Sequence, residues 1–249
     1  GMTAEGDTMP ISLIRSAWAG SAKYGALVWS GDIVSTFECF RRQVQAGLNM
    51  AIAGIPWWTT DIGGFHGART DDPDFHRLYI RWFEYGCFCP VMRLHGNRNP
   101  QEGYGAEQIG SGSDNEIWSF GDKAYEISKK YIFLRERLRD YIRTQMKKAH
   151  EDGTPMMRPV FYDFPTDQES WNVEDAYLFG PDLYVAPVME DHVTEREVYL
   201  PDGTAWFNAW TGEKYEGGQN VTVAAPLDTI PVFVKEGADA EKLLNIFSE

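Results

Sequence analysis

The chain has 249 residues, of which 43% are hydrophobic and 24% charged, and its formal net charge is −14. This balance is typical of a soluble globular protein with one large domain or two small ones. A surface this acidic repels phosphate backbones, and we therefore expect no nucleic-acid partner. No apolar run approaches the roughly 18 residues needed to span a bilayer, and no signal segment opens the chain. We therefore expect no membrane association and a cytoplasmic location.

The three cysteines are Cys39, Cys87 and Cys89, an odd count without the spacing of a zinc site or a disulfide framework. We expect buried structural thiols, no metal site and no cofactor. Aromatic residues make up 14% of the chain and include 9 tryptophans. Aromatic rings suit the apolar faces of sugars, but they also fill large cores. Composition alone leaves both interpretations open.

The first part of the chain alternates short apolar runs with helical patterns. Residues 26–29 form the first run, and Ser35 then opens a helix with Glu38 three residues on, the pattern of a capping box. A second apolar run covers residues 50–58 and leads to Asp61. The expected buried face of the helix between them comprises Phe37, Phe40, Val44 and Leu48.

The alternation continues with a helix over residues 74–85 and an apolar run over residues 89–95. Strands alternating with helices predict a parallel sheet joined by right-handed crossovers. One long helix is predicted from Asp122 to Glu151, with Gly153 as its stop signal. Its apolar stripe comprises Tyr131, Leu134, Leu138, Tyr141, Ile142 and Met146.

The pattern changes after residue 153. Short β-rich runs such as residues 196–200 and 221–223 are separated by turn sequences. These turns are Pro201-Asp202-Gly203, Thr211-Gly212-Glu213 and Gly217-Gly218. We predict an α/β unit over residues 1–153 and a small antiparallel β-sandwich over residues 154–249, joined at a packed junction.

Polar side chains follow three of the predicted strands where each strand ends. They are Asp32, Asp61 and His95, and the tryptophans beside them are Trp29, Trp57 and Trp58. In parallel α/β architectures the active site lies at the carboxyl ends of the strands, so these side chains should converge. Paired carboxylates with aromatic walls are the equipment of glycoside hydrolysis. Spacing alone would make Asp32 and Asp61 an acid and nucleophile pair.

Each of these three polar residues also has a plainer interpretation. Asp32 could merely begin the helix entry that Ser35 caps. Asp61 could be a turn former before Gly63-Gly64. His95 could be a structural histidine with its hydrogen bonds satisfied. The spacing does not decide between these alternatives.

A larger set of motifs, spread from about residue 13 to residue 237, resembles glycoside hydrolase family 31. In the first part it comprises Arg15-Ser16, Trp29-Ser30-Gly31-Asp32, Asp61-Ile62-Gly63-Gly64-Phe65, Arg81-Trp82 and Arg93-Leu94-His95-Gly96. In the second part it comprises Gly153-Thr154-Pro155-Met156-Met157-Arg158-Pro159, Val185-Ala186-Pro187-Val188, Leu200-Pro201-Asp202-Gly203 and Trp206. That family comprises retaining enzymes that act mostly on α-glycosides, such as α-glucosidases and α-xylosidases.

The resemblance implies a role for each matching residue. Asp32 matches the family's general acid/base. The residues that match its sugar ligands and aromatic walls are Arg15, Asp61, His95, Trp29 and Phe65. Asp61 is then a sugar ligand and not the nucleophile. The expected substrate is an α-linked oligosaccharide or an α-xyloside, and the choice between glucose and xylose stays open.

The resemblance also implies an architecture, the second half of a (β/α)8 TIM barrel followed by a small antiparallel β-sandwich. The family's nucleophile is an Asp on an earlier strand, and residues 1–14, with Glu5 and Asp7, do not resemble that segment. These residues alone could therefore be an inactive sugar-binding or structural piece. Half a barrel has open edges, so we expect self-association. The inward face is expected at Val28, Ile52, Ile55 and Met92.

Overall fold

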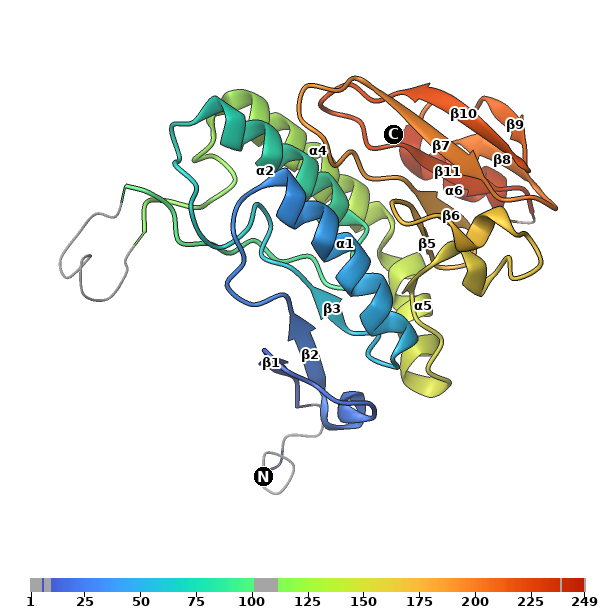
Figure 1. The fold of residues 1–249 in the computed structure, drawn as a ribbon, viewed down its shortest axis with the longest axis horizontal. Coiled ribbons are helices and arrows are strands. Elements are labelled where there is room, and N and C mark those ends of the chain that lie inside the picture. The colour runs from blue at the N-terminus through green and yellow to red at the C-terminus, as the bar shows by residue number, and fades with distance from the viewer. Residues whose placement is uncertain (1–5, 7–9, 101–111, 238, 249) are drawn as a thin grey trace.

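The computed structural model describes residue 6, residues 10–100, residues 112–237 and residues 239–248. Glu5 and Asp7 of the leader lie outside the described residues. A small parallel sheet and a layer of helices form the first part of the structure (Figure 1). An antiparallel sandwich forms the second part, on the other side of the helices. The predicted α/β architecture followed by a β-sandwich is confirmed.

The parallel sheet contains three short strands in the order β1-β2-β3. They are β1 (Ser12–Ile14), β2 (Ala26–Trp29) and β3 (Trp58–Thr59). Leu13 pairs with Leu27, and Val28 pairs with Trp58, so all three strands run in the same direction. Strand β2 coincides with the first predicted run. Strand β1 was not predicted, although Arg15 follows it as Asp32 follows β2. A 3-10 turn, η2 (Ser21–Tyr24), lies between these two strands.

Helix α1 (Phe37–Ile52) follows β2, and two predictions about its ends are wrong. The residue that caps it is Thr36 and not Ser35, because the Thr36 hydroxyl accepts a hydrogen bond from the Cys39 N–H at 3.1 Å. Residues 50–52 belong to the helix and not to a strand. Ile52 therefore lies half-exposed at the helix end, and not on an inward barrel face.

Helix α2 (Pro73–Cys87) confirms the second predicted helix and extends it at both ends. Asp72 caps it, and proline occupies the first turn, where its missing N–H costs nothing. The next predicted strand, residues 89–95, is wrong as a regular strand. This segment runs beside β3 with two backbone hydrogen bonds, from Val91 to Trp58 at 3.2 Å and from Ile62 to Arg93 at 3.3 Å. Two isolated hydrogen bonds do not form the regular hydrogen-bond ladder of a β-sheet.

The predicted long helix is divided in two, α4 (Gly121–Arg137) and α5 (Arg139–Glu151). The break falls at Leu138, which is fully buried and has a ψ of −1°. The hydrogen bonds on either side persist, from Leu138 to Leu134 at 3.0 Å and from Ile142 to Leu138 at 2.9 Å. The apolar stripe continues through the break, so periodicity could not reveal it.

The sandwich pairs a six-stranded antiparallel sheet, in the order β4-β5-β6-β11-β8-β9, with the two-stranded ribbon β7-β10. The sheet strands are β4 (Met157–Arg158), β5 (Tyr177–Phe179), β6 (Leu183–Val185), β11 (Val232–Lys235), β8 (Ala205–Asn208) and β9 (Lys214–Glu216). The ribbon strands are β7 (Glu195–Leu200) and β10 (Gln219–Ala224), and α6 (Ala240–Ser248) follows β11. Two 3-10 turns, η3 (Val160–Tyr162) and η4 (Glu169–Trp171), join β4 to β5.

One hydrophobic core crosses the boundary between the two parts. Phe40 of α1 and Tyr85 of α2 belong to the same buried cluster as Phe179 and Val232 of the sandwich. A second cluster around Trp206 lies within the sandwich. The junction is therefore packed, as the lack of a linker in the sequence predicted. Cys87 and Cys89 are buried in this shared core, while Cys39 is half-buried.

Candidate active site

The parallel strands bring three loops to one edge of the small sheet. Arg15 follows β1, Asp32 lies three residues after the end of β2, and Asp61 lies two residues after β3. Gly31 has a φ of +77°, a conformation that only glycine adopts readily, and it turns the chain just before Asp32. Functional residues of parallel α/β folds gather at this edge of the sheet. The loops that carry Arg15, Asp32 and Asp61 therefore lie at the same edge of the sheet.

Asp32 lies at the surface of this edge and pairs with Arg15. The Arg15 Nη2 atom is 2.8 Å from the Asp32 Oδ2 atom, with the two side chains 61% and 38% exposed. The Arg15 guanidinium also lies 5.4 Å from the centre of the Trp29 ring. An ion pair this exposed contributes little to stability. Both charged groups therefore remain accessible to a ligand, with the half-buried Trp29 ring beside them.

Asp61 has the opposite environment. Its side chain is fully buried and accepts a hydrogen bond from Arg93 through Oδ1. Burial raises the pKa of Asp61, and the negative charge of Asp32 adds to this, while Arg93 and His95 oppose it. The Oδ2 atom has no hydrogen-bond partner among the described residues. A buried acceptor without a partner is rare and costly in a folded protein.

The backbone of Asp61 forms a turn, because the Gly64 N–H donates to its carbonyl at 2.9 Å. The carboxylate takes no part in that turn, which makes the turn-former interpretation incomplete. Phe65, at the end of the turn, is half-buried and faces His95, with the ring centres 5.4 Å apart. The His95 side chain is exposed, so it is not a core residue.

Backbone hydrogen bonds hold the loops after Asp32, Asp61 and His95 against one another. The Phe65 N–H donates to the Ile33 carbonyl at 2.7 Å, and the Asn97 N–H donates to the Phe65 carbonyl at 2.8 Å. The loop that carries Phe65 is thus bonded to the loop after Asp32 and to the loop after His95. All six site residues predicted from the sequence lie on these connected loops or at the ends of their strands.

Sequence reasoning missed two arginines at this site. Arg93 lies two residues before His95, the spacing that places two side chains on the same side of an extended segment, and this signal could have identified it. Arg98 lies in a polar loop and carries no such signal. One tryptophan has to be reassigned. Trp58 is 3% exposed and packs on Gly47 of α1, so it is a core residue and not a sugar wall.

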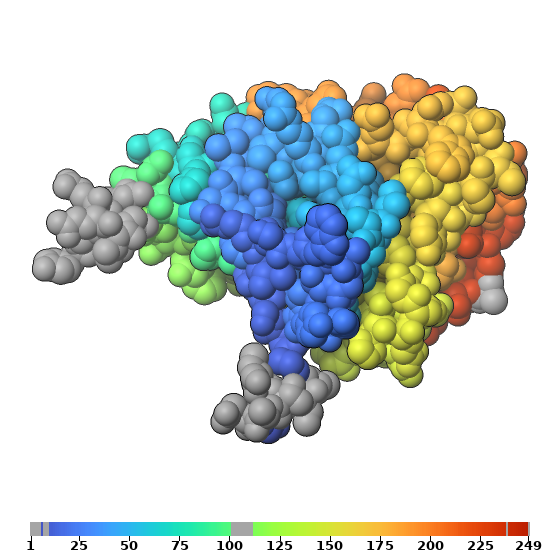
Figure 2. Space-filling view, turned by 60° about the horizontal axis from the view of Figure 1, so that its bottom comes forward, coloured from blue at the N-terminus to red at the C-terminus, as the bar shows by residue number. Residues whose placement is uncertain are grey.

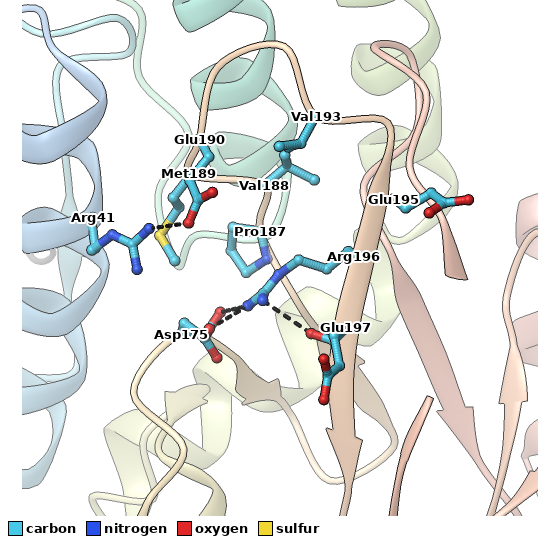
Figure 3. Close-up of a pocket in the computed structure, with 10 residues that line it drawn as sticks. All are labelled: Arg41, Asp175, Pro187, Val188, Met189, Glu190, Val193, Glu195, Arg196 and Glu197. Atoms are coloured by element: carbon cyan, nitrogen blue, oxygen red, sulfur yellow. Dashed lines mark hydrogen bonds and ion pairs between the residues drawn. The ribbon is translucent and has the colours of Figure 1, made fainter. Parts of the chain in front are cut away.

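A separate polar pocket lies where α1 meets the sandwich (Figure 3). It is lined by Arg41, Asp175, Pro187, Val188, Met189, Glu190, Val193, Glu195, Arg196 and Glu197. Its two arginines are paired, Arg41 with Glu190 at 2.8 Å and Arg196 with Asp175 at 2.7 Å. None of the predicted site residues lines it. We interpret it as a polar part of the junction between the two parts of the chain.

The described residues thus form a small parallel sheet with acidic and aromatic residues at its carboxyl edge, followed by an antiparallel sandwich. The chain matches the glycosyl hydrolases family 31 TIM-barrel domain over residues 1–145 and the glycosyl hydrolase family 31 C-terminal domain over residues 153–238. The chain belongs to glycoside hydrolase family 31, and the resemblance noted in the sequence is confirmed.

Several relatives are similar over nearly all of the chain. An alpha-xylosidase from Saccharolobus solfataricus is 39% identical over 92% of this chain, and alpha-glucosidase 2 from Bacillus thermoamyloliquefaciens is 35% identical over 92%. The crystal structure of a family 31 alpha-xylosidase from a soil metagenome, complexed with xylose, superposes on 98% of the chain with a TM-score of 0.93 and 53% identity. The chain spans 29% and 27% of the two curated relatives and 37% of the crystallised chain. Among the described residues no helix is both long and apolar enough to cross a membrane.

Proposed function

We propose that this chain supplies the general acid/base and part of the sugar-binding set of a retaining α-glycosidase. One observation carries the proposal. An accessible Asp32 and a buried Asp61 with a free acceptor atom lie on adjacent strand-end loops, with Arg15 and Trp29 beside Asp32. The two carboxyl groups, Asp32 and Asp61, are therefore suited to different roles. An exposed carboxyl can exchange its proton with substrate and water, whereas a buried carboxylate can hold a sugar hydroxyl in one orientation.

The proposed mechanism has two steps. In the first, Asp32 donates its proton to the glycosidic oxygen while a second carboxylate attacks the anomeric carbon and forms a glycosyl-enzyme intermediate. In the second, Asp32 removes a proton from water, which attacks the same carbon and releases the sugar with retained configuration. The attacking carboxylate is expected on an earlier barrel strand, in a segment with no counterpart in residues 1–14. A protein that joins such a segment to this chain would carry both carboxylates, and it is called the longer protein below.

Asp61, Arg15 and His95 are proposed to hydrogen-bond the sugar at the cleavage site. Trp29 and Phe65 are proposed as its aromatic walls. Both residues are only half-buried, which supports this, because part of each side chain remains accessible to a ligand. The proposed substrate is an α-xyloside or an α-linked oligosaccharide. The alpha-xylosidases among the relatives favour xylose, while the alpha-glucosidase keeps glucose as the second candidate.

The test is an assay of the longer protein on aryl α-xyloside and aryl α-glucoside, with NMR detection of the anomer released first. We expect turnover with retained configuration on at least one of them. Inverted configuration, or no turnover on either, would contradict the proposal. The same assay on these 249 residues alone tests the alternative of an inactive sugar-binding piece. We expect no turnover there.

We also propose that these 249 residues self-associate through the open edge of the small sheet. Strand β1 lies at that edge with Leu13 40% exposed, and Ile11, the residue before the strand, is 69% exposed. Figure 2 shows this blue N-terminal segment at the surface of the molecule. The apolar area is smaller than the sequence predicted, since Val28 and Ile55 are already buried. Light scattering after size exclusion tests the proposal, and a monomer across the micromolar range would contradict it. The cytoplasmic location stays a prediction.

A further inference from the structure

Arg98 is fully buried although it belongs to a loop. Its guanidinium makes a forked set of hydrogen bonds. Nη1 donates to the Gly64 carbonyl at 2.7 Å, Nη2 donates to the Ile62 carbonyl at 3.1 Å, and Nε donates to the Asn115 Oδ1 atom at 2.7 Å. A longer contact, at 3.4 Å, joins Nη1 to the Ser35 hydroxyl. The planar group also lies 4.7 Å from the centre of the Phe75 ring.

These acceptors belong to the loops that form the candidate active site. Ile62 and Gly64 lie within the turn between Asp61 and Phe65. Ser35 lies three residues after Asp32, and Arg98 itself lies three residues after His95. One side chain therefore connects the loops that follow Asp32, Asp61 and His95. Lysine could not do this, because its ammonium is a single point donor without the fork geometry of a guanidinium.

The packing around the guanidinium leaves little room for movement. A Cβ added to Gly63 would lie 3.1 Å from Nη2, and a Cβ added to Gly96 would collide with the guanidinium carbon. Both glycines are close to site residues, Gly63 to Asp61 and Gly96 to His95. The two loops can approach the arginine this closely because they carry glycine at these positions.

The positive charge of Arg98 is stabilised by carbonyl, amide and hydroxyl oxygens. No carboxylate is among its hydrogen-bond partners in the described part of the chain. Burial lowers the pKa of Arg98 to about 10, while the negative charge of Asp61 opposes that shift. An apolar side chain of similar size would avoid this desolvation cost, so stability alone does not explain a buried arginine here.

We propose that Arg98 is a positioning residue for the sugar site, which fixes the loop from Asp61 to Phe65 relative to Asp32 and His95. It acts through backbone carbonyls and does not touch the sugar. This inference rests on the proposed function. One buried side chain then determines where the acid/base lies relative to the sugar ligands. An error of about 1 Å in such a placement costs about a hundredfold in rate.

The test compares Arg98→Lys with Arg135→Lys in the longer, active protein. Arg135 is the control, because it is half-buried and likewise donates to three carbonyls, those of Cys87, Cys89 and Pro90, at 2.6 to 3.0 Å. These carbonyls lie at the far end of the segment that leads to His95. We expect kcat/KM to fall about 10- to 100-fold for Arg98→Lys and less than about threefold for Arg135→Lys, at similar losses of Tm.

The dependence on the leaving group separates positioning from acid catalysis. A misplaced sugar loop should slow activated and unactivated glycosides by the same factor, and it should weaken binding of the free sugar. Equal kcat/KM losses in the two lysine variants, or a loss confined to poor leaving groups, would overturn the inference. If Arg98→Lys does not fold, Asn115→Leu, which removes only the acceptor of Nε, should show the same pattern with a smaller loss. Absence of turnover and sugar binding in the wild type would instead overturn the proposed function, and this inference with it.

Discussion

The two sheets of this protein differ in how they are stabilised. In the sandwich sheet every residue of β5 and β6 is buried, and β11 pairs with a strand on each side. In the parallel sheet β3 contributes only two paired residues, and β1 leaves Leu13 40% exposed at an open edge. The centre of the sandwich sheet is thus fully buried, whereas the parallel sheet is short and partly exposed at one edge. The residues proposed for chemistry all lie on the parallel sheet and its loops.

A buried cluster connects the two parts. Arg81 of α2 donates to the carbonyls of Ala225 at 2.6 Å and Pro226 at 3.0 Å, which belong to the sandwich. The same guanidinium pairs with Glu84 at 3.1 Å, and the Glu84 carboxyl also accepts from the Tyr131 hydroxyl of α4. The helices are thus tied to the sandwich by directed hydrogen bonds as well as by the shared core.

The largest effect on activity is expected from Asp32→Asn in the longer protein. Loss of the general acid should lower kcat by about 10²- to 10⁴-fold for glycosides with poor leaving groups. Substrates with strongly acidic leaving groups need little protonation, so their first step should suffer much less. The measurement is kcat and kcat/KM on a series of aryl glycosides. Equal and small losses across the series would show that the parallel sheet edge does not carry the acid.

The largest effect on stability is expected in the sandwich. Trp206 is fully buried, packs on Tyr184 and donates its indole N–H to the Pro201 carbonyl at 3.0 Å. Trp206→Ala should lower the free energy of unfolding by about 3–5 kcal/mol. Leu13→Ala in the exposed edge strand should cost no more than about 1 kcal/mol. Urea unfolding of the 249-residue chain measures both losses of free energy. Similar losses for the two variants would show that the two sheets do not differ in this way.

Removal of the sugar ligands should have an intermediate effect on activity. His95→Ala and Asp61→Ala should each cost about 2–4 kcal/mol of transition-state stabilisation, the scale of a charged or buried hydrogen bond at a reacting centre. The measurement is kcat/KM in the longer protein, with Tm as the control for folding. A fall of less than about tenfold in both variants would make these residues structural.

A further prediction concerns pH and the junction. Burial raises the pKa of Glu84 to about 8, above the value of about 4.3 for an unperturbed glutamate. Between these values the unfolded chain releases a proton that the folded chain keeps, so the free energy of unfolding falls as the pH rises. Glu84→Gln should flatten that slope. Urea unfolding at pH 5 and pH 8 tests this, and parallel slopes in the two proteins would place the titrating group elsewhere.

The sequence alone was sufficient for the family, the order of the two parts and the site motifs. Local signals carry these features, because a strand end followed by Gly31-Asp32, a turn at Gly63-Gly64 or a β-rich run between turn residues depends on few neighbours. The same local signals were misleading at element ends. Residues 50–52 continue the helix because Ala51 still faces its buried side, and apolar residues there suit a helix as well as a strand.

Only the tertiary structure shows which of the charged side chains are buried and which groups they bind. Arg98 appears in the sequence as part of a polar loop, yet it is fully buried against the carbonyls of Ile62 and Gly64. The sequence likewise shows Asp32 and Asp61 as similar strand-end carboxylates, whereas one is accessible and the other is fully buried. These differences arise from contacts between segments more than thirty residues apart. Burial and electrostatics depend on all surrounding segments at once, so no local pattern could reveal them.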